Sequence, residues 1–182
     1  MRKYWLILFL IFLTAKVQAS IKENIIKNFN SIDNLTFDFE QNINGKVEKG
    51  NCTLQYPKKI FCKYDLSNQK ILVSDGRSMV IKTKSSFYLY PLEKTALKFI
   101  LNKDYLLNKI KYLDERTIDN KFINYKLVES NYEINIFFDK KNLNLIGWQT
   151  IDIYQNLSIT FLSSIIKNRK LKKDLFKLPI QN

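Results

Sequence analysis

Side chains that can carry out chemistry are scarce in this sequence, and its two cysteines have the most specific spacing. Cys52 and Cys62 lie on either side of Pro57, in two short runs that alternate apolar and polar residues. If the chain turns near Pro57, the two cysteines face each other, as directly opposed residues of an antiparallel strand pair do. In an exported protein this arrangement indicates a disulfide, and two small buried hydrophobic residues are the alternative. A metal site is not expected, because the chain has no histidine and no third cysteine.

Catalytic patterns are missing from the rest of the chain. No serine or cysteine stands in a nucleophile elbow, and four glycines leave little room for a phosphate-binding loop. Asp114 and Glu115 are types that do acid–base work. Adjacent residues of a strand point to opposite faces, however, so this pair is better explained as surface charge. We therefore expect a binding protein, not an enzyme, with no cofactor.

Three predicted strands position the two cysteines. The first starts at Gly50 and ends before Pro57, the second covers residues 60–64, and the third runs from residue 69 to residue 74. Asp75-Gly76 follows, a dipeptide typical of a tight hairpin turn because glycine adopts positive φ at no steric cost. The pattern predicts a β-meander with one apolar face.

The remaining elements are also mostly strands. Ser20 and Glu23 have the spacing of a capping box, and Ile21, Ile25, Phe29 and Ile32 then follow on one face of a helix. Strands in sequence with short turns indicate an antiparallel sheet, covered on one face by the few helices. The fold class is therefore α+β and mainly β. Strands are expected at residues 35–43, 78–83, 87–90, 111–117, 122–129, 132–139, 145–154 and 157–166, and short helices at 95–101 and 105–110.

The N-terminus has the pattern of an export signal. A cationic start precedes an unbroken apolar run over residues 5–13, and Val17-Gln18-Ala19 supplies small residues where a signal peptidase reads. The apolar run is shorter than the roughly 20 residues of a membrane span. We expect residues 1–19 to be a cleaved signal peptide, with an uncleaved anchor as the alternative, and residues 20–182 to be a single domain in the periplasm.

The charge of the chain is strongly positive but dispersed. The net charge is +13, and three of these charges, on Arg2, Lys3 and Lys16, leave with the signal peptide. No long Lys/Arg block occurs, so a nucleic-acid partner is not expected. A diffuse attraction to anionic membrane surfaces stays open.

Six motifs in order resemble the LolA family of periplasmic outer-membrane lipoprotein carriers. The resemblance extends from about residue 37 to residue 179, and the order of the motifs carries it, since each alone is weak. The motifs are Phe39-x-Gln41, the strand from Gly50 to Pro57, residues 60–64, Ile71-Leu72-Val73-Ser74-Asp75-Gly76, Tyr90-Pro91-Leu92-x-Lys94-Thr95-x-Leu97, and Gly147-Trp148-Gln149-x-x-Asp152.

This resemblance implies an unclosed antiparallel β-barrel, or half-barrel, with a helical lid over its concave face. The helices near residues 97–107 would form the lid and open on loading. The enclosed cavity would hold the acyl chains of lipoproteins, whereas the residues alone also fit an ordinary core. The implied partners are acylated lipoproteins, an ATP-driven extraction complex in the inner membrane and an outer-membrane acceptor, with the carrier a monomer. We assign to the cavity Phe37, Phe39, Leu54, Ile60, Tyr64, Leu97, Ile100 and Trp148.

The sequence departs from the family at one position. An arginine precedes the proline of the central hairpin in the family and helps to latch the lid, but here that residue is Tyr56. A latch at this position would need the tyrosine hydroxyl as donor. Four other functions stay open. The chain could be a carrier or sensor of another amphiphile such as a phospholipid or glycolipid, a stress sensor with a second domain, or an exported nucleic-acid binder. It could also be a receptor-type relative, although such a protein would carry a lipidated cysteine where this chain has Ser20.

Overall fold

A computed structural model describes residues 20–66, 68–129, 132–151 and 156–181 of the chain. The predicted signal peptide, the Ser130-Asn131 turn and Asp152 lie outside these residues. The helical elements are α2 (Ile21–Asn30), η2 (Leu92–Lys94), α3 (Leu97–Ile100) and α4 (Lys103–Ile110). The strands are β1 (Asn34–Ile43), β2 (Lys46–Gln55), β3 (Lys59–Tyr64), β4 (Ile71–Asp75), β5 (Ser78–Lys82), β6 (Phe87–Pro91), β7 (Arg116–Ile118), β8 (Phe122–Glu129), β9 (Tyr132–Asp139), β10 (Leu145–Ile151) and β11 (Leu157–Lys167).

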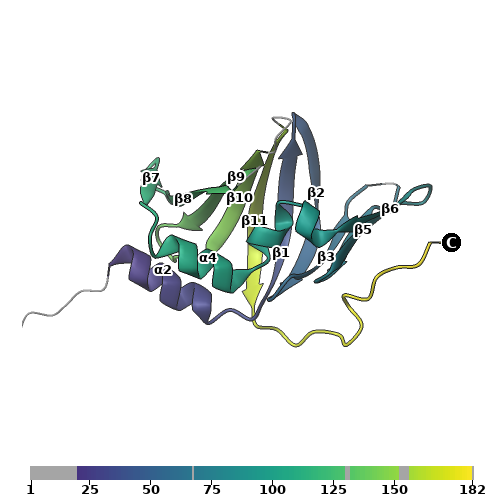
Figure 1. The fold of residues 1–182 in the computed structure, drawn as a ribbon, viewed down its shortest axis with the longest axis horizontal. Coiled ribbons are helices and arrows are strands. Elements are labelled where there is room, and N and C mark those ends of the chain that lie inside the picture. Colours follow the sequence, from purple (N-terminus) through teal and green to yellow (C-terminus); the bar gives the residue numbers. More distant parts are fainter. Residues whose placement is uncertain (1–19, 67, 130–131, 152–155, 182) are drawn as a thin grey trace, which may run out of the picture.

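The strands form one curved antiparallel sheet of eleven strands, in the order β6-β5-β4-β3-β2-β1-β11-β10-β9-β8-β7. Two meanders, β1 to β6 and β7 to β11, are joined where β1 pairs with β11. The strands β6 and β7 end the sheet and do not pair with each other, so the barrel is unclosed. All three described α-helices lie over one face (Figure 1). The predicted half-barrel with covering helices is therefore confirmed.

The central hairpins form as predicted, with one shift. Cys52 pairs with Cys62 and Leu54 with Ile60 across the turn at Pro57. The strand before this turn begins at Lys46 and not at Gly50, because Asn44-Gly45 makes a tight turn with φ of 48° and 89°. Gly50 lies inside the strand, where an added Cβ would be 2.1 Å from the Lys63 carbonyl oxygen. Glycine is needed there for the close approach of β3.

One predicted strand is wrong in most of its length. Residues 111–113 continue the turn that ends α4, since the backbone N–H of Tyr112 donates to the Lys109 carbonyl at 3.0 Å. Tyr112 is 87% exposed, so its side chain gains nothing from a sheet face. Only Arg116 and Thr117 of the predicted segment belong to a strand, β7, which ends one residue later at Ile118.

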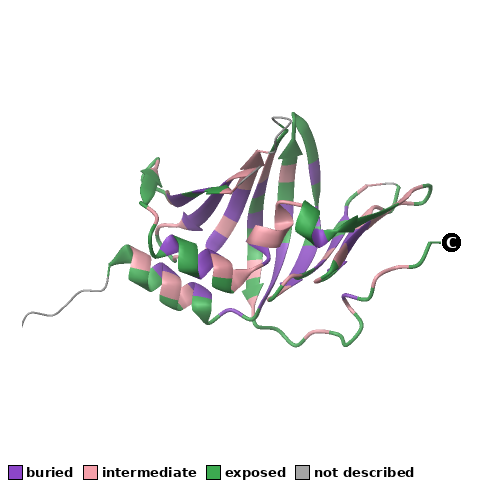
Figure 2. Cartoon of the chain, viewed as in Figure 1, coloured by how far each residue is buried: buried purple, intermediate pink, exposed green. Residues whose placement is uncertain are grey.

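The helices pack on the concave face through a few large apolar side chains. Ser20 caps α2 with the predicted capping box, its Oγ accepting from the Glu23 N–H at 3.2 Å. Ile25 and Phe29 of this helix are fully buried, and the Phe29 ring meets Phe138 of β9 edge-on at 5.7 Å. Figure 2 shows the buried stripe that follows the sheet beneath the helices. None of the helices within residues 20–181 that the structure describes is long and apolar enough to cross a membrane.

The C-terminal segment after β11 returns along the sheet to its other half (Figure 1). Asn168 attaches its start, because its side-chain oxygen accepts from the Asp33 N–H at 2.7 Å. Phe176 is buried, and farther on the Lys82 ammonium donates to the Ile180 carbonyl at 3.0 Å. Pro179 also lines a surface pocket with Lys63 of β3, Ile71 of β4 and Lys82 of β5, so this segment lies beside these three strands.

Candidate functional site

A small, mainly apolar cavity lies between the concave face of the sheet and α3. Its volume is about 40 Å³. Six of the eight residues predicted for the cavity line it, and they lie on three strands, β1, β3 and β10, and on α3. The lining consists of Phe37, Phe39, Gln41, Cys52, Ile60, Cys62, Tyr64, Leu72, Leu97, Trp148 and Thr160.

The two other predicted residues, Leu54 and Ile100, do not line the cavity. Both are 0% exposed and belong to the packed core. Sequence reasoning missed Leu72 and the polar pair Gln41 and Thr160. Side chains alternate between the two faces of a strand, so Gln41 lies on the same face of β1 as Phe37 and Phe39. This alternation was the signal that could have predicted Gln41 in the lining.

Aromatic rings fill much of the space around this cavity. Phe39 meets Tyr64 edge-on with ring centroids 5.0 Å apart, and Phe37 meets Trp148 at 6.3 Å. The Phe39 ring lies against Gly50, since a Cβ at this glycine would be 2.9 Å from the ring. The absence of a side chain at Gly50 therefore lets the aromatic ring turn into the lining.

The predicted disulfide between Cys52 and Cys62 is present. The two Cα atoms are 4.1 Å apart across directly opposed positions of β2 and β3, and both cysteines line the cavity. Neither is therefore a free thiol. The disulfide links β2 to β3, the two strands that supply Cys52, Ile60 and Cys62 to the cavity lining.

Polar side chains form one rim of the cavity. The Gln41 amide donates to Thr160 Oγ1 at 3.2 Å and to Ser158 Oγ at 3.1 Å. Glu48, which pairs with Gln41 in the sheet, is only 4% exposed and contacts the ammonium groups of Lys70 and Lys46. The concave face is thus apolar beneath the helices, and it carries charged side chains next to Tyr64, where Glu48, Lys46 and Lys70 lie.

Two pKa values at this rim are shifted in opposite directions. Burial alone would raise the pKa of the Glu48 carboxyl, but hydrogen bonds and charge from Lys70 and Lys46 outweigh it and lower the pKa below its usual value. Burial, with a smaller contribution from the Glu48 carboxylate, raises the pKa of the Tyr64 hydroxyl. Glu48 is therefore a carboxylate at neutral pH and Tyr64 a neutral phenol.

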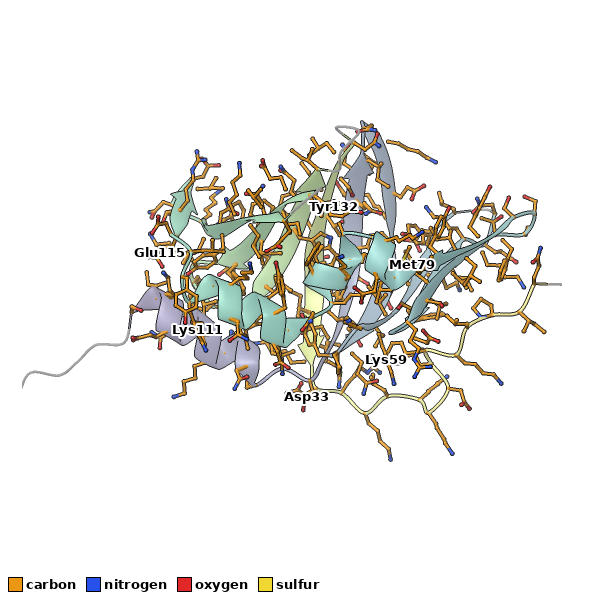
Figure 3. The ribbon with its side chains drawn as sticks, in the orientation of Figure 1. Asp33, Lys59, Met79, Lys111, Glu115 and Tyr132 are labelled. Atoms are coloured by element: carbon orange, nitrogen blue, oxygen red, sulfur yellow. A yellow bond between two sulfur atoms is a disulfide. The ribbon has the colours of Figure 1, made fainter. Side chains whose placement is uncertain are left out.

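The segment over the cavity is residues 92–107, made of η2, α3 and the first turns of α4, which we call the lid. Polar contacts hold it on three sides. Lys58 on the β2–β3 turn donates its backbone N–H to the Leu101 carbonyl at 2.8 Å, and its ammonium pairs with Glu93 at 2.8 Å. Tyr132 of β9, labelled in Figure 3, donates its hydroxyl to the Lys94 carbonyl at 3.0 Å. Lys103 reaches the Ile32 carbonyl at 2.8 Å.

Tyr56 does not hold the lid through its hydroxyl in this structure. The hydroxyl is buried without a hydrogen-bond partner among the described residues. The ring meets Phe29 edge-on at 5.6 Å and so belongs to the core under α2. The hairpin contacts the lid through the Tyr56 ring, 5.8 Å from the Lys103 ammonium, and through Lys58, which follows Pro57 instead of preceding it.

The acidic side chains do not gather into a metal-binding cluster within the part of the chain that the structure describes. No three residues among its Cys, Asp and Glu come together as ligands for a metal ion. Asp114 lines a separate surface pocket with Arg116 and Asn124, and Glu115 accepts a hydrogen bond from the Tyr125 hydroxyl at 3.3 Å. The two carboxylates thus contact different residues and do not act as a pair.

Comparison with known proteins identifies the family. The sequence profile described as outer membrane lipoprotein carrier protein LolA matches residues 30–179. No protein of curated function matches the chain. A LolA superfamily protein from Nitrosomonas europaea is 10% identical with a TM-score of 0.45, over 88% of this chain and 99% of that one.

Two mycobacterial structures are similar at the same level. For LprF from Mycobacterium bovis the identity is 11% and the TM-score 0.46, over 85% of this chain and 95% of that one. For the lipoprotein LppX from Mycobacterium tuberculosis the identity is 9% and the TM-score 0.44, over 83% and 96%. The profile match itself covers most of the sequence, from the end of α2 to Pro179. This chain therefore belongs to the LolA family of outer membrane lipoprotein carrier proteins.

Proposed function

We propose that this chain is a periplasmic carrier that shields the acyl chains of lipoproteins and takes them from the inner to the outer membrane. The observation that supports this best is the aromatic cavity on the concave face, covered by a lid that few polar contacts hold. Membership of the family supports the same function.

A carrier is needed because acyl chains do not enter water freely. Three chains of about 16 carbons expose roughly 45 methylenes, and at about 0.8 kcal/mol each the gross cost in water is on the order of 35 kcal/mol. A protein that covers these chains with apolar side chains removes most of this barrier. It acts by binding and not by catalysis.

The cavity as described is too small for this cargo, so loading requires the lid to move. Pockets that bury small organic ligands have about 300–1,000 Å³, whereas this cavity has about 40 Å³, close to the volume of one water molecule in the liquid. We take the structure as the closed state. Moving residues 92–107 away from the sheet would expose Leu97 and the aromatic lining to the acyl chains.

The partners follow from this cycle. The sequence has no nucleotide-binding motif, so an ATP-driven complex in the inner membrane would load the carrier and an outer-membrane acceptor would receive the cargo. Binding must be strong relative to water and weak relative to the acceptor. Export through the predicted signal peptide, residues 1–19, would place the carrier in the periplasm.

A carrier of another amphiphile is the second candidate, and the polar rim favours it. Lys46 and Lys70 lie beside the cavity mouth around Glu48, where the headgroup of a phospholipid or glycolipid would lie if its chains filled the cavity. The ligand that is extracted decides between these candidates.

The test incubates residues 20–182 with energised spheroplasts that display newly made lipoproteins and assays the soluble fraction. We expect soluble complexes of lipoprotein and carrier that form only when ATP is supplied inside. Release without lipoprotein, but with phospholipid or glycolipid found by mass spectrometry, would favour the second candidate. If no amphiphile is released, the carrier proposal is wrong.

A matched pair of variants tests the cavity itself. Leu97→Gln places an amide in the cavity lining, whereas Leu157→Gln makes the same change at an exposed position of β11 outside it. We expect at least a tenfold loss of complex for Leu97→Gln, because a buried amide without a partner opposes apolar binding, and little change for Leu157→Gln. Equal complex formation by the two variants would contradict the assignment of this cavity.

A further inference from the structure

The two edges of the sheet are protected very differently. Edge strands expose unpaired N–H and C=O groups, and proteins usually guard them with short strands or charges. At one edge β7 has three residues, begins with Arg116 and is flanked by Glu115 and Asp119. At the other edge β6 has five residues, Phe-Tyr-Leu-Tyr-Pro, and no charged residue occurs from residue 85 to residue 92.

The side chains of β6 are also unusually exposed for their type. Tyr88 is 51%, Leu89 59% and Tyr90 41% exposed, and the strand forms an exposed margin of the sheet in Figure 2. The two tyrosine rings stack with centroids 6.4 Å apart. An exposed apolar strip of this kind marks an interaction surface more often than a random feature of the surface.

The register shows which backbone groups of β6 are free. The Leu92 N–H donates to the Arg77 carbonyl and the Thr83 N–H to the Ser86 carbonyl, each at 2.9 Å. Directly opposed residues in an antiparallel pair alternate between hydrogen-bonded and non-hydrogen-bonded. Tyr88 and Tyr90 therefore bond to Ile81 and Met79 of β5, and the N–H and C=O groups of Phe87 and Leu89 point away from the sheet.

The charges around this edge are mainly positive. Four cations, Arg77, Lys82, Lys84 and Lys94, lie on β5 or close to the ends of β6. The two nearby acids are already engaged: the Asp75 carboxylate accepts from backbone N–H groups of its turn, and Glu93 pairs with Lys58. A segment that pairs with β6 and carries acids at its ends would meet these cations.

We propose that β6 is a docking edge for an extended, acid-flanked peptide segment of another protein, which adds to the sheet as a further strand. Main-chain hydrogen bonds to Phe87 and Leu89 would supply the affinity, and Tyr88, Tyr90 and the cations the selectivity. A second copy of this chain fits less well, because two basic edges would face each other. The proposal does not rest on lipid binding.

A synthetic heptapeptide, acetyl-Asp-Thr-Val-Thr-Val-Thr-Asp-amide, is the probe, and the same peptide with lysine at both ends is its charge control. Binding is followed by NMR of the labelled protein, with amide hydrogen exchange read at Phe87 and Leu89. We expect the acid-flanked peptide to protect these two amides and to bind more tightly than the lysine peptide, by a margin that shrinks as salt is added.

Two substitutions at one position separate the backbone from the side chain. Leu89→Pro removes the outward N–H and leaves the ladder to β5 intact, whereas Leu89→Thr keeps this N–H and removes the leucine side chain. We expect Leu89→Pro to weaken peptide binding about tenfold, the effect of a lost hydrogen bond and a poorer fit at the edge, and Leu89→Thr to weaken it less. Unchanged exchange in the rest of the sheet shows that both variants are folded.

Three results would overturn the proposal. The first is the absence of saturable binding at millimolar acid-flanked peptide. The second is equal binding by Leu89→Pro and Leu89→Thr. The third is protection of Phe87 and Leu89 that depends on protein concentration and not on peptide, which would assign the edge to a second copy of the chain.

Discussion

Glu48 combines a full charge with near-complete burial on the concave face of the half-barrel. Its carboxylate is 4% exposed and has Lys70 on one oxygen and Lys46, at 3.1 Å, on the other. Lys70 also lies 4.1 Å above the Tyr64 ring, so the ion pair continues directly into the cavity lining. A buried carboxylate persists only if its partners offset the loss of water around it. The three side chains therefore act as one unit at the rim.

This arrangement predicts how stability depends on pH. Because the pKa of Glu48 is lowered in the folded state, its contribution to stability is present above the unfolded pKa, near 4.3, and is lost as the pH falls through the folded value. Glu48→Gln leaves Lys70 without its counter-ion, and we expect a loss of roughly 2 kcal/mol in the free energy of unfolding at pH 7. At about pH 3 the loss should be smaller, since protonation of wild-type Glu48 then removes part of the same charge interactions.

Urea unfolding at the two pH values measures this difference. Glu40→Gln is the control, because Glu40 pairs with Lys49 on the surface, where its side chain is 57% exposed, and such pairs contribute at most about 1 kcal/mol. A loss for Glu48→Gln that is the same at both pH values would show that packing and not charge makes Glu48 important.

At the scale of elements, the lid is held by polar contacts at its ends and by the fully buried side chains of Leu92, Ile100 and Leu106. The Lys58–Glu93 pair lies at one end, and the Tyr132 hydroxyl on the Lys94 carbonyl is a second contact. Contacts of this kind contribute about 0.5–1 kcal/mol each. Opening the lid also exposes its buried apolar side chains, so the burial of acyl chains must offset that cost, while the sheet beneath the lid stays intact.

The double variant Lys58→Met with Tyr132→Phe should raise the population of the open lid about tenfold, because two contacts of this strength are lost together. The backbone amide at position 58, which donates to the Leu101 carbonyl of the lid at 2.8 Å, reports opening through native-state hydrogen exchange. Lys59→Met, one residue along the same turn, is the control. Exchange of this amide that matches the wild type, after correction for the intrinsic rate of the new residue, would mean that apolar packing alone closes the lid.

The sequence predicted correctly those elements whose turn or cap is formed by residues close together in the chain. The capping box at Ser20, the hairpin around Pro57 with its disulfide, and the tight turn at Asp75-Gly76 all form as expected. In each, the residues that decide the structure lie within a few positions of one another, so spacing alone carries the information.

Features set by distant partners could not be predicted in this way. Alternation places Leu54 on the same face as Cys52, but whether this residue meets a cavity or a packed helix depends on α2 and on the lid. Likewise, nothing near Leu35 indicates that it pairs with Lys167 of β11. The Lys58 contact with the lid was missed because it uses a backbone N–H, which every residue except proline carries.

The whole molecule is two meanders that share one concave face. The join between β1 and β11 lies under the centre of the lid region (Figure 1), and the cavity takes residues from both halves, with Phe37 on β1 and Trp148 on β10. Movement of the lid relative to this continuous sheet can enlarge the space without breaking any strand pair. The proposed function requires the cavity to enlarge in this way.

Binding of single-chain amphiphiles of increasing length distinguishes an opening molecule from a closed one. If the lid opens, each added methylene is buried and should improve affinity about fourfold, the effect of about 0.8 kcal/mol. If the cavity stays near 40 Å³, affinity should stop rising after the first methylenes. Calorimetry with lysophospholipids of about 8 to 16 carbons measures this slope. The double variant Lys58→Met with Tyr132→Phe should bind every chain length more tightly with the same slope, because the cost of opening the lid arises once per molecule and not once per methylene.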